Sequence, residues 1–228
     1  MTYQALLFDM DGVVIDTHQP VTAFWEALAS QHNVQLTPAI FDQYIYGSPA
    51  IDTLDHVFPQ LATSEREAVI QRLLESETNQ VYAEVRGMTA LLRELKRRGI
   101  ATALVTSGER WKVDAVVRQL GLAGLFAVEV TAGDIRQGKP HPECYLLAAQ
   151  RLQVAPERCI VFEDSINGVK AAAASGALCI GVRPAGTAAA LVAVGAQHVI
   201  ENFEVVRVVS NTLLLGGEDR LALSRSRE

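Results

Sequence analysis

Two aspartates one residue apart, Asp9 and Asp11, follow a short apolar run and are succeeded at once by Gly12. Because side chains alternate along a strand, positions i and i+2 can face the same site. Gly12 permits a tight turn or a close approach of the backbone. Two neighbouring acids repel each other unless a cation lies between them or one holds a proton. The pattern indicates metal binding or acid–base chemistry, although an acidic turn after a strand has the same local sequence.

Further side chains able to do chemistry stand where later apolar runs end. They are Thr106 and Ser107 after residues 100–105, Glu163 and Asp164 after residues 159–162, and Lys139 in a Gly-Lys-Pro loop. Each has an ordinary explanation by itself, as a strand-end cap, a helix cap or a solvated lysine. In a parallel sheet, however, ligands bind beyond the carboxyl ends of the strands. We therefore expect these side chains to converge on one crevice.

The residue types at these positions suit phosphate chemistry. Mg²⁺ takes hard oxygen ligands, typically one or two carboxylates with waters and substrate phosphate, so Asp9 and Asp164 are the expected pair. A backbone carbonyl near Asp11 could add a ligand. Lys139 and the Thr106 hydroxyl would hold phosphate oxygens. Asp9 could attack phosphorus, and Asp11 could protonate the leaving oxygen and then activate water.

The elements that position these residues follow from the hydrophobic pattern. From residue 86 onward helices and strands alternate, which predicts an α/β fold with a doubly wound parallel sheet. The expected helices are 89–98, 111–120, 142–152 and 166–175, and the expected strands are 100–105, 127–131, 159–162, 178–182 and 198–200. Residues 17–84 contain helical patterns without a strand, so they form an insertion after the first strand.

Within this insertion, Thr37-Pro38 predicts one helix start, and Ser64 with Glu67 predicts a capping box at another. We expect His18, near the hinge of the insertion, to be an ordinary loop histidine. The tail from residue 216 to residue 228 is polar and expected to be frayed.

The composition limits the partners. The 228 residues suit one large domain or a domain with an insert. A net charge of −6 argues against nucleic acid and anionic membrane, whereas a small phosphorylated metabolite needs only a local positive pocket. No signal peptide or continuous membrane segment is visible. Three cysteines without a Cys-x-x-Cys motif indicate a reducing compartment. We expect a cytoplasmic protein and favour a monomer.

The same residues carry a family resemblance. Residues 8–13 (Phe-Asp-Met-Asp-Gly-Val), 105–108 (Val-Thr-Ser-Gly), 138–140 (Gly-Lys-Pro) and 162–165 (Phe-Glu-Asp-Ser) resemble, in order, the four signature motifs of the haloacid-dehalogenase-like hydrolases. The resemblance covers nearly the whole chain. It implies a Rossmann-like catalytic core, residues 1–16 and 85–228, and a helical cap, residues 17–84.

The resemblance also implies roles for the motif residues. These are Asp9 as nucleophile, Asp11 as acid/base, Thr106, Ser107 and Lys139 as the substrate-binding group, and Asp9, Asp11 and Asp164 around Mg²⁺, with Glu163 as a nearby acid whose direct ligation varies. Dehalogenases and phosphonate-cleaving relatives lack an acid at the position of Asp11, so its presence favours phosphoester chemistry. Residues 46–54 and 75–78 resemble sugar-phosphate and glycerol-phosphate phosphatases. We predict a Mg²⁺-dependent phosphatase acting on a small phosphorylated sugar or polyol through an aspartyl phosphate.

Two alternatives stay open. The β-phosphoglucomutase-like branch usually carries a cap histidine where this chain has Val21, and a cap lysine in the segment near Glu75 and Glu77. A mutase must hold a second phosphate, which acidic residues would repel. Many caps also carry an arginine after the glycine that matches Gly47, where this chain has Ser48. The other alternative is a non-catalytic regulatory protein on the same fold.

Overall fold

The computed structural model describes residues 1–225, apart from the side chain of Ala185. Six parallel strands form the central sheet in the order β4-β3-β2-β5-β6-β7. Their bounds are β2 (Ala5–Phe8), β3 (Ala101–Val105), β4 (Val128–Val130), β5 (Cys159–Glu163), β6 (Leu178–Val182) and β7 (His198–Ile200). The strand order reverses beside β2, and ligands bind at such a switch point. The predicted α/β fold is confirmed.

Helices cover both faces of this sheet because side chains alternate along the strands. Leu6 and Phe8 pack in one apolar cluster with α5 (Met88–Arg98) and α6 (Arg110–Leu120). Ala5 and Leu7 pack in a second cluster with α7, α8 and α9. These three helices span Glu143–Arg151, Ile166–Ser175 and Ala188–Ala193. The predicted helices are confirmed to within two residues at each end.

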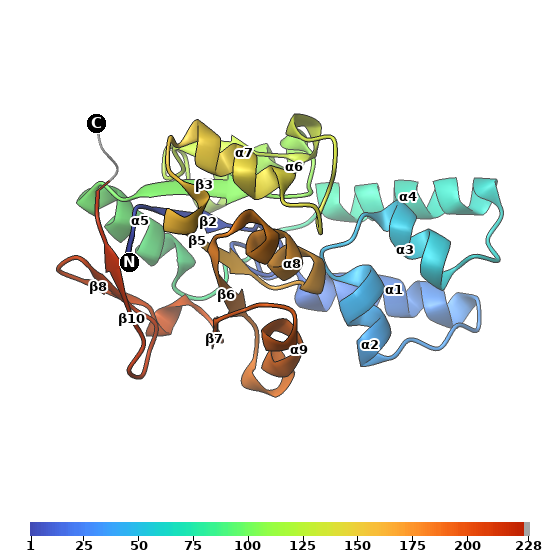
Figure 1. The fold of residues 1–228 in the computed structure, drawn as a ribbon. Coiled ribbons are helices and arrows are strands. Elements are labelled where there is room, and N and C mark those ends of the chain that lie inside the picture. Colours follow the sequence, from blue (N-terminus) through green and yellow to red (C-terminus); the bar gives the residue numbers. More distant parts are fainter. Residues whose placement is uncertain (226–228) are drawn as a thin grey trace.

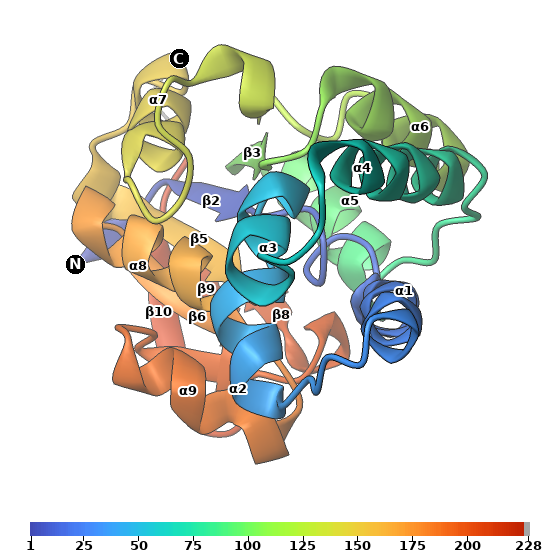
Figure 2. The same ribbon diagram turned by 90° about the vertical axis from the view of Figure 1, so that its right-hand side faces the viewer.

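The insertion is helical, as expected, and lies at one end of the sheet (Figures 1 and 2). It comprises α1 (His18–Gln31), α2 (Pro38–Ile40), the π-helical turn η1 (Phe41–Ile45), α3 (Ala50–Val57) and α4 (Thr63–Thr78). It has its own apolar cluster, which includes Trp25, Leu54 and Phe58 and draws only on residues 21–73. Tyr82, which lies within the expected cap range, is buried instead in the core cluster that contains α5.

Of the two predicted helix starts in the cap, one is confirmed and one is wrong. Thr37 caps α2 by accepting a hydrogen bond from the Ile40 N–H, with Pro38 in the first turn. The α4 helix begins at Thr63, where the Ala62 N–H donates to the Glu65 carboxylate (2.8 Å). The expected capping box of Ser64 and Glu67 does not form, because Glu65 reaches back to the helix start instead.

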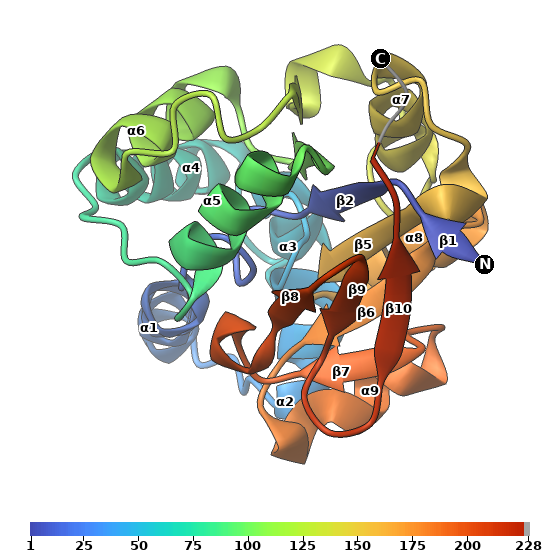
Figure 3. The ribbon, with the colours of Figure 1, turned by 90° about the vertical axis from the view of Figure 1, so that its left-hand side faces the viewer.

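A second, smaller sheet was not expected. Its strand order is β1-β10-β9-β8, and β1 pairs parallel with β10 near the chain ends (Figure 3). The strands span Thr2–Tyr3, Arg220–Leu223, Thr212–Leu214 and Arg207–Val209 in that order. Leu213 and Leu223 are buried in the cluster that contains α5. The expectation of a frayed tail is therefore wrong for residues 220–223, and residues 226–228 lie outside the described part of the chain.

The remaining elements are short 3₁₀ helices, η2 (Ala132–Asp134), η3 (Pro156–Arg158), η4 (Ala185–Thr187) and η5 (Phe203–Val205). Across residues 1–225, no helix combines the length and the apolar character that crossing a membrane requires. The three cysteines, Cys144, Cys159 and Cys179, are buried and free of disulfides.

Candidate active site

Asp9 lies at the carboxyl end of β2, in the middle of the sheet. Its backbone N–H donates to the carbonyl of Phe162 on β5 (3.0 Å), which fixes the start of the loop. The Nζ atom of Lys139, from the loop before α7, donates to Asp9 Oδ1 (2.6 Å). The same Nζ atom donates to Glu163 Oε1 (2.5 Å). One buried ammonium group therefore connects two buried carboxylates.

Both oxygens of Glu163 already have protein donors. Besides Lys139, Oε1 accepts from the Tyr145 hydroxyl (2.7 Å). Oε2 accepts from the N–H groups of Asp164 (3.0 Å) and Ser165 (3.2 Å) and from the Ser165 hydroxyl (3.1 Å). The side chain is fully buried. This arrangement suits a residue that orients Lys139 better than one that offers an oxygen to a metal.

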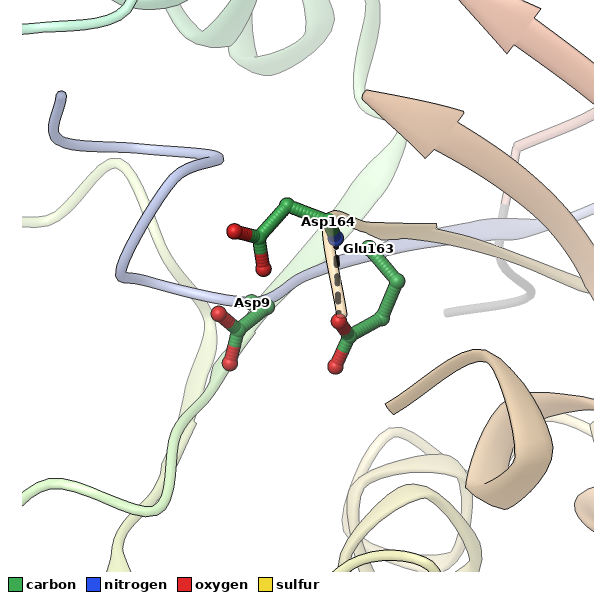
Figure 4. A group of neighbouring side chains, drawn as sticks. All are labelled: Asp9, Glu163 and Asp164. Atoms are coloured by element: carbon green, nitrogen blue, oxygen red, sulfur yellow. Dashed lines mark hydrogen bonds between the residues drawn. The ribbon is translucent and has the colours of Figure 1, made fainter. Parts of the chain in front are cut away.

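Asp164 follows β5 and faces the loop after β2. A Cβ at residue 12 would overlap the Asp164 carboxylate, and Gly12 has a φ of +74°, so glycine is required there for two reasons. Asp164 Oδ2 lies 3.0 Å from His18 Nε2, a contact that the sequence did not predict. Asp9, Glu163 and Asp164 each offer one oxygen within 4.8 Å of the others (Figure 4).

The charges in this cluster do not balance. Burial raises the pKa of Asp9 well above its ordinary value, although Lys139 opposes the shift. Burial also raises the pKa of Asp164, against the contact with His18. Lys139 contacts two of the three buried carboxylates and His18 contacts the third, and the close approach of three acids favours a bound cation. The donors are hard oxygens, so the residues present fit Mg²⁺.

Thr106 and Ser107 follow β3 and occupy different environments. Thr106 is buried, and its Oγ1 atom accepts from the Gly108 N–H (2.9 Å), which leaves the hydroxyl hydrogen for another acceptor. Ser107 is exposed and lines a cavity of about 320 Å³ together with Asp11 and Asp164. The cap side of this cavity is mostly apolar, formed by Val21, Trp25, Ile45, Ile70, Leu73 and Leu74.

Asp11 contacts a lysine that the sequence analysis missed. Lys112, on α6, approaches both carboxylate oxygens of Asp11 with its Nζ atom (2.9 and 3.1 Å). It also donates to Oε1 of Glu77 at the end of α4 (2.7 Å). Burial alone would lower the pKa of Lys112, but the two carboxylates outweigh it and hold the pKa above its ordinary value. Lys112 therefore stays charged between the core and the cap.

Cap and core also make contact at the end of β6. Arg183, after β6, donates to Asp42 Oδ1 in the cap (2.6 Å) and lies over the Tyr46 ring (5.6 Å). A cavity of about 660 Å³ opens beside it, separated from the smaller one by His18 and Tyr46, which line both. We assign the chemistry to the smaller cavity because Asp11 lines it and is absent from the larger one.

Ser48 in the cap lines the smaller cavity and also contacts the core. Its Oγ atom accepts from Asn167 Nδ2 at 3.5 Å, and a Cβ at Gly47 would overlap the Ser165 side chain. The loop that carries Ser48 therefore rests on the start of α8. Where many caps place an arginine, this cap offers a hydroxyl to the core.

Comparison with known proteins gives consistent matches. The family model described as haloacid dehalogenase-like hydrolase matches residues 3–176. Hexitol phosphatase A of Escherichia coli (strain K12) is 35% identical over 192 residues, which cover 82% of this chain and 87% of that protein. The phosphorylated carbohydrates phosphatase of Thermotoga maritima is 30% identical over 216 residues, covering 92% of this chain and all (100%) of that protein.

A solved structure gives a similar result. A HAD family hydrolase from Deinococcus radiodurans R1, with bound phosphate and sodium, superposes with a TM-score of 0.67 at 28% identity. The match covers 86% of this chain and 90% of that one.

Proposed function

Because the chain belongs to the haloacid dehalogenase-like hydrolases, we propose that it is a Mg²⁺-dependent phosphatase that hydrolyses a small phosphorylated sugar or polyol. The observation that carries this proposal is the burial of the Asp9 carboxylate and its contact with Lys139. It is buried at the end of the central strand, and Lys139 holds its Oδ1 atom at 2.6 Å. Oδ2 is then the oxygen left to attack phosphorus.

The substrate class follows from the cavity and from the relatives. A volume of about 320 Å³ lies at the lower end of the range for small-molecule sites. The relatives at 30% identity or more include a hexitol phosphatase and a phosphorylated carbohydrates phosphatase. Both observations favour a phosphorylated sugar or sugar alcohol over a larger substrate.

The proposed residue roles divide the reaction into two steps. Asp9 Oδ2 attacks phosphorus, the bond from phosphorus to the leaving oxygen breaks, and Asp11 gives that oxygen a proton. Asp11 then takes a proton from the water that attacks the aspartyl phosphate, which releases inorganic phosphate and restores Asp9. Lys139 and the Thr106 hydroxyl hold phosphate oxygens during both steps.

The metal-binding part of the proposal rests on Asp9, Glu163 and Asp164, which each offer one oxygen within 4.8 Å of the others. Asp9 and Asp164 would hold Mg²⁺, with the backbone carbonyl of Asp11, while Glu163 would orient Lys139. When bound, the ion neutralises charge on the phosphate oxygens. The surrounding residues exclude water from Asp9, which has 7% of its surface exposed.

A phosphatase is favoured over a mutase because of the charge on the cap. Glu77 reaches the cavity beside Asp11, where a mutase would need to hold a second phosphate. A carboxylate there would repel that phosphate. No positively charged cap residue lines this cavity among the described residues apart from His18 at its edge.

Release of inorganic phosphate from a panel of phosphorylated metabolites tests the proposal. We expect turnover with hexitol and sugar monophosphates in Mg²⁺, none after chelation, and none from Asp9→Asn. Asp11→Asn should slow turnover by about 10²- to 10⁴-fold, the usual contribution of general acid–base catalysis. Phosphate release by Asp9→Asn at the wild-type rate would contradict the nucleophile assignment.

A further inference from the structure

Lys112 connects the proposed acid/base residue to the cap. Its Nζ atom contacts both oxygens of Asp11 and one oxygen of Glu77, all within 3.1 Å. The lysine side chain is only 8% exposed, whereas the side chains of Asp11 and Glu77 are 32% and 26% exposed. Leaving a buried ammonium group without its carboxylate partners costs more free energy than breaking an ion pair on the surface. The three groups therefore act as one unit.

The α6 helix supplies Lys112 and also holds the segment that follows α4. Gln119, two helical turns further along α6, accepts from the Tyr82 N–H (3.0 Å) and donates to the Gln80 carbonyl (3.2 Å). The Tyr82 hydroxyl donates to the backbone carbonyl of Glu77 (2.9 Å). Contacts from one face of α6 thus fix where the end of α4 lies. The Lys112–Glu77 pair is part of this docking rather than an isolated surface contact.

The position of Glu77 within its helix is unusual. It lies in the last turn of α4, which ends at Thr78 and has no basic residue in that turn. A carboxylate there faces the negative end of the helix dipole, which disfavours its charge. The neighbouring Glu75 pairs with Gln71 instead (3.0 Å). Lys112 supplies the positive charge that Glu77 lacks within its own helix.

We propose that Lys112 is a positioning residue, which holds the Asp11 carboxyl group for proton transfer when the cap brings Glu77 against it. When Asp11 carries the proton on one oxygen, Lys112 keeps its contact with the other. The inference rests on the proposed phosphatase function. Contact with both oxygens of Asp11 fixes the plane of the carboxylate, and contact with Glu77 makes that position depend on the cap. Proton transfer to the leaving oxygen is then efficient only over a closed site, where bulk water is excluded.

Two substrates that differ in their need for a proton provide the test. Nitrophenolate departs without protonation, whereas the alkoxide of a sugar alcohol does not. We therefore compare kcat/KM for p-nitrophenyl phosphate and sorbitol phosphate, because this parameter reports the step in which the leaving group departs. The variants are Lys112→Met, Lys112→Arg and Glu77→Gln, with Lys170→Met as the control, since Lys170 is an exposed lysine on the core helix α8.

Lys112→Met should lower kcat/KM for sorbitol phosphate by about 100-fold, at the low end of general acid–base catalysis, and leave p-nitrophenyl phosphate nearly unchanged. Lys112→Arg should restore much of the loss, and Lys170→Met should match the wild type on both substrates. Glu77→Gln should produce a smaller loss with the same preference. Because Lys112 and Glu77 act together, the double variant should lose no more than Lys112→Met alone.

Three results would overturn the inference. Equal losses on both substrates would mean that Lys112 binds the phosphate or only supports the fold. No loss on sorbitol phosphate would mean that Asp11 does not need the lysine. Additive losses in the double variant would mean that Lys112 acts independently of Glu77 in the cap. If Lys112→Met fails to fold, as judged by circular dichroism, Glu77→Gln provides the test. An equal loss of kcat/KM on both substrates in that variant would contradict the proposal by itself.

The phosphatase proposal fails separately from this inference. If the wild type released phosphate from neither substrate, the proposed function would be refuted. Turnover of both substrates by the wild type, with no selective loss in the variants, would refute only the role of Lys112.

Discussion

Replacing Tyr145 by phenylalanine should destabilise the protein through a single lost hydrogen bond. The Tyr145 hydroxyl donates to Glu163 Oε1 at 2.7 Å, and both side chains are buried. Phenylalanine keeps the ring in place and removes only the donor. Glu163 then retains Lys139 on the same oxygen, so the substitution measures one contact to a buried carboxylate.

The magnitude follows from the charge on the acceptor. A hydrogen bond to a charged group contributes about 1.5–3 kcal/mol, more than a neutral pair. For a protein of 150–250 residues, each kcal/mol shifts the melting temperature by about 2–4 °C. Tyr145→Phe should therefore lower the melting temperature by about 3–12 °C.

Thermal unfolding and urea unfolding of the chelated protein would measure this loss. Tyr44→Phe is the matched control, because the Tyr44 hydroxyl makes no hydrogen bond within residues 1–225. We expect the control to lie within about 0.5 kcal/mol of the wild type, as for most partly exposed substitutions. If Tyr145→Phe is no less stable than the control, the bond contributes nothing, and the account of how Glu163 is held is wrong.

Three further predictions follow from the site and its surroundings. Gly12→Ala should cost about 1–3 kcal/mol for a side chain at positive φ. It should also abolish phosphate release, because the new Cβ overlaps Asp164. Mg²⁺ at about 100 times its dissociation constant should stabilise the wild type by about 2.7 kcal/mol, and Asp164→Asn should remove that gain in thermal melting. The Arg151 guanidinium, with the Thr131 N–H, lowers the pKa of Asp134 from 3.8 to about 2. A carboxyl with a lowered pKa stabilises the fold above its unfolded pKa and loses that effect as pH falls through its folded pKa. Asp134→Asn should therefore lower the urea midpoint at neutral pH, with the deficit shrinking between pH 3.8 and pH 2.

Much of the fold and part of the site follow from local sequence patterns. Each long apolar run became a strand of the central sheet, and the residues after these runs met at one edge because parallel strands end together. Asp9, Lys139 and Asp164 come together for this reason, although 130 residues separate the first two. Their roles in catalysis stay predictions until the variants are measured.

The contacts that the sequence did not predict depend on tertiary structure. Lys112 lies within a helix and reads locally as a solvated lysine, and only its docking against α4 brings Glu77 to it. The one local signal was an acid in the last turn of a helix, which calls for a positive partner. His18, at the start of the cap, became a partner of Asp164, at the end of β5, and only the folded chain brings these two residues together.

The small sheet was missed for a related reason. Its strands are two to four residues long and join opposite ends of the chain, so no local window contains the pairing. Burial of Leu223 against the core is what orders the tail, and that contact depends on the completed fold.

Acid quenching during turnover tests the central claim most directly. The wild type is mixed with a hexitol phosphate in Mg²⁺, stopped in acid, digested and analysed by mass spectrometry. We expect one added phosphoryl group on the peptide that contains Asp9, and none in Asp9→Asn treated in the same way. Two results would contradict the account. One is an added phosphoryl group on a residue other than Asp9, and the other is full activity in Asp9→Asn.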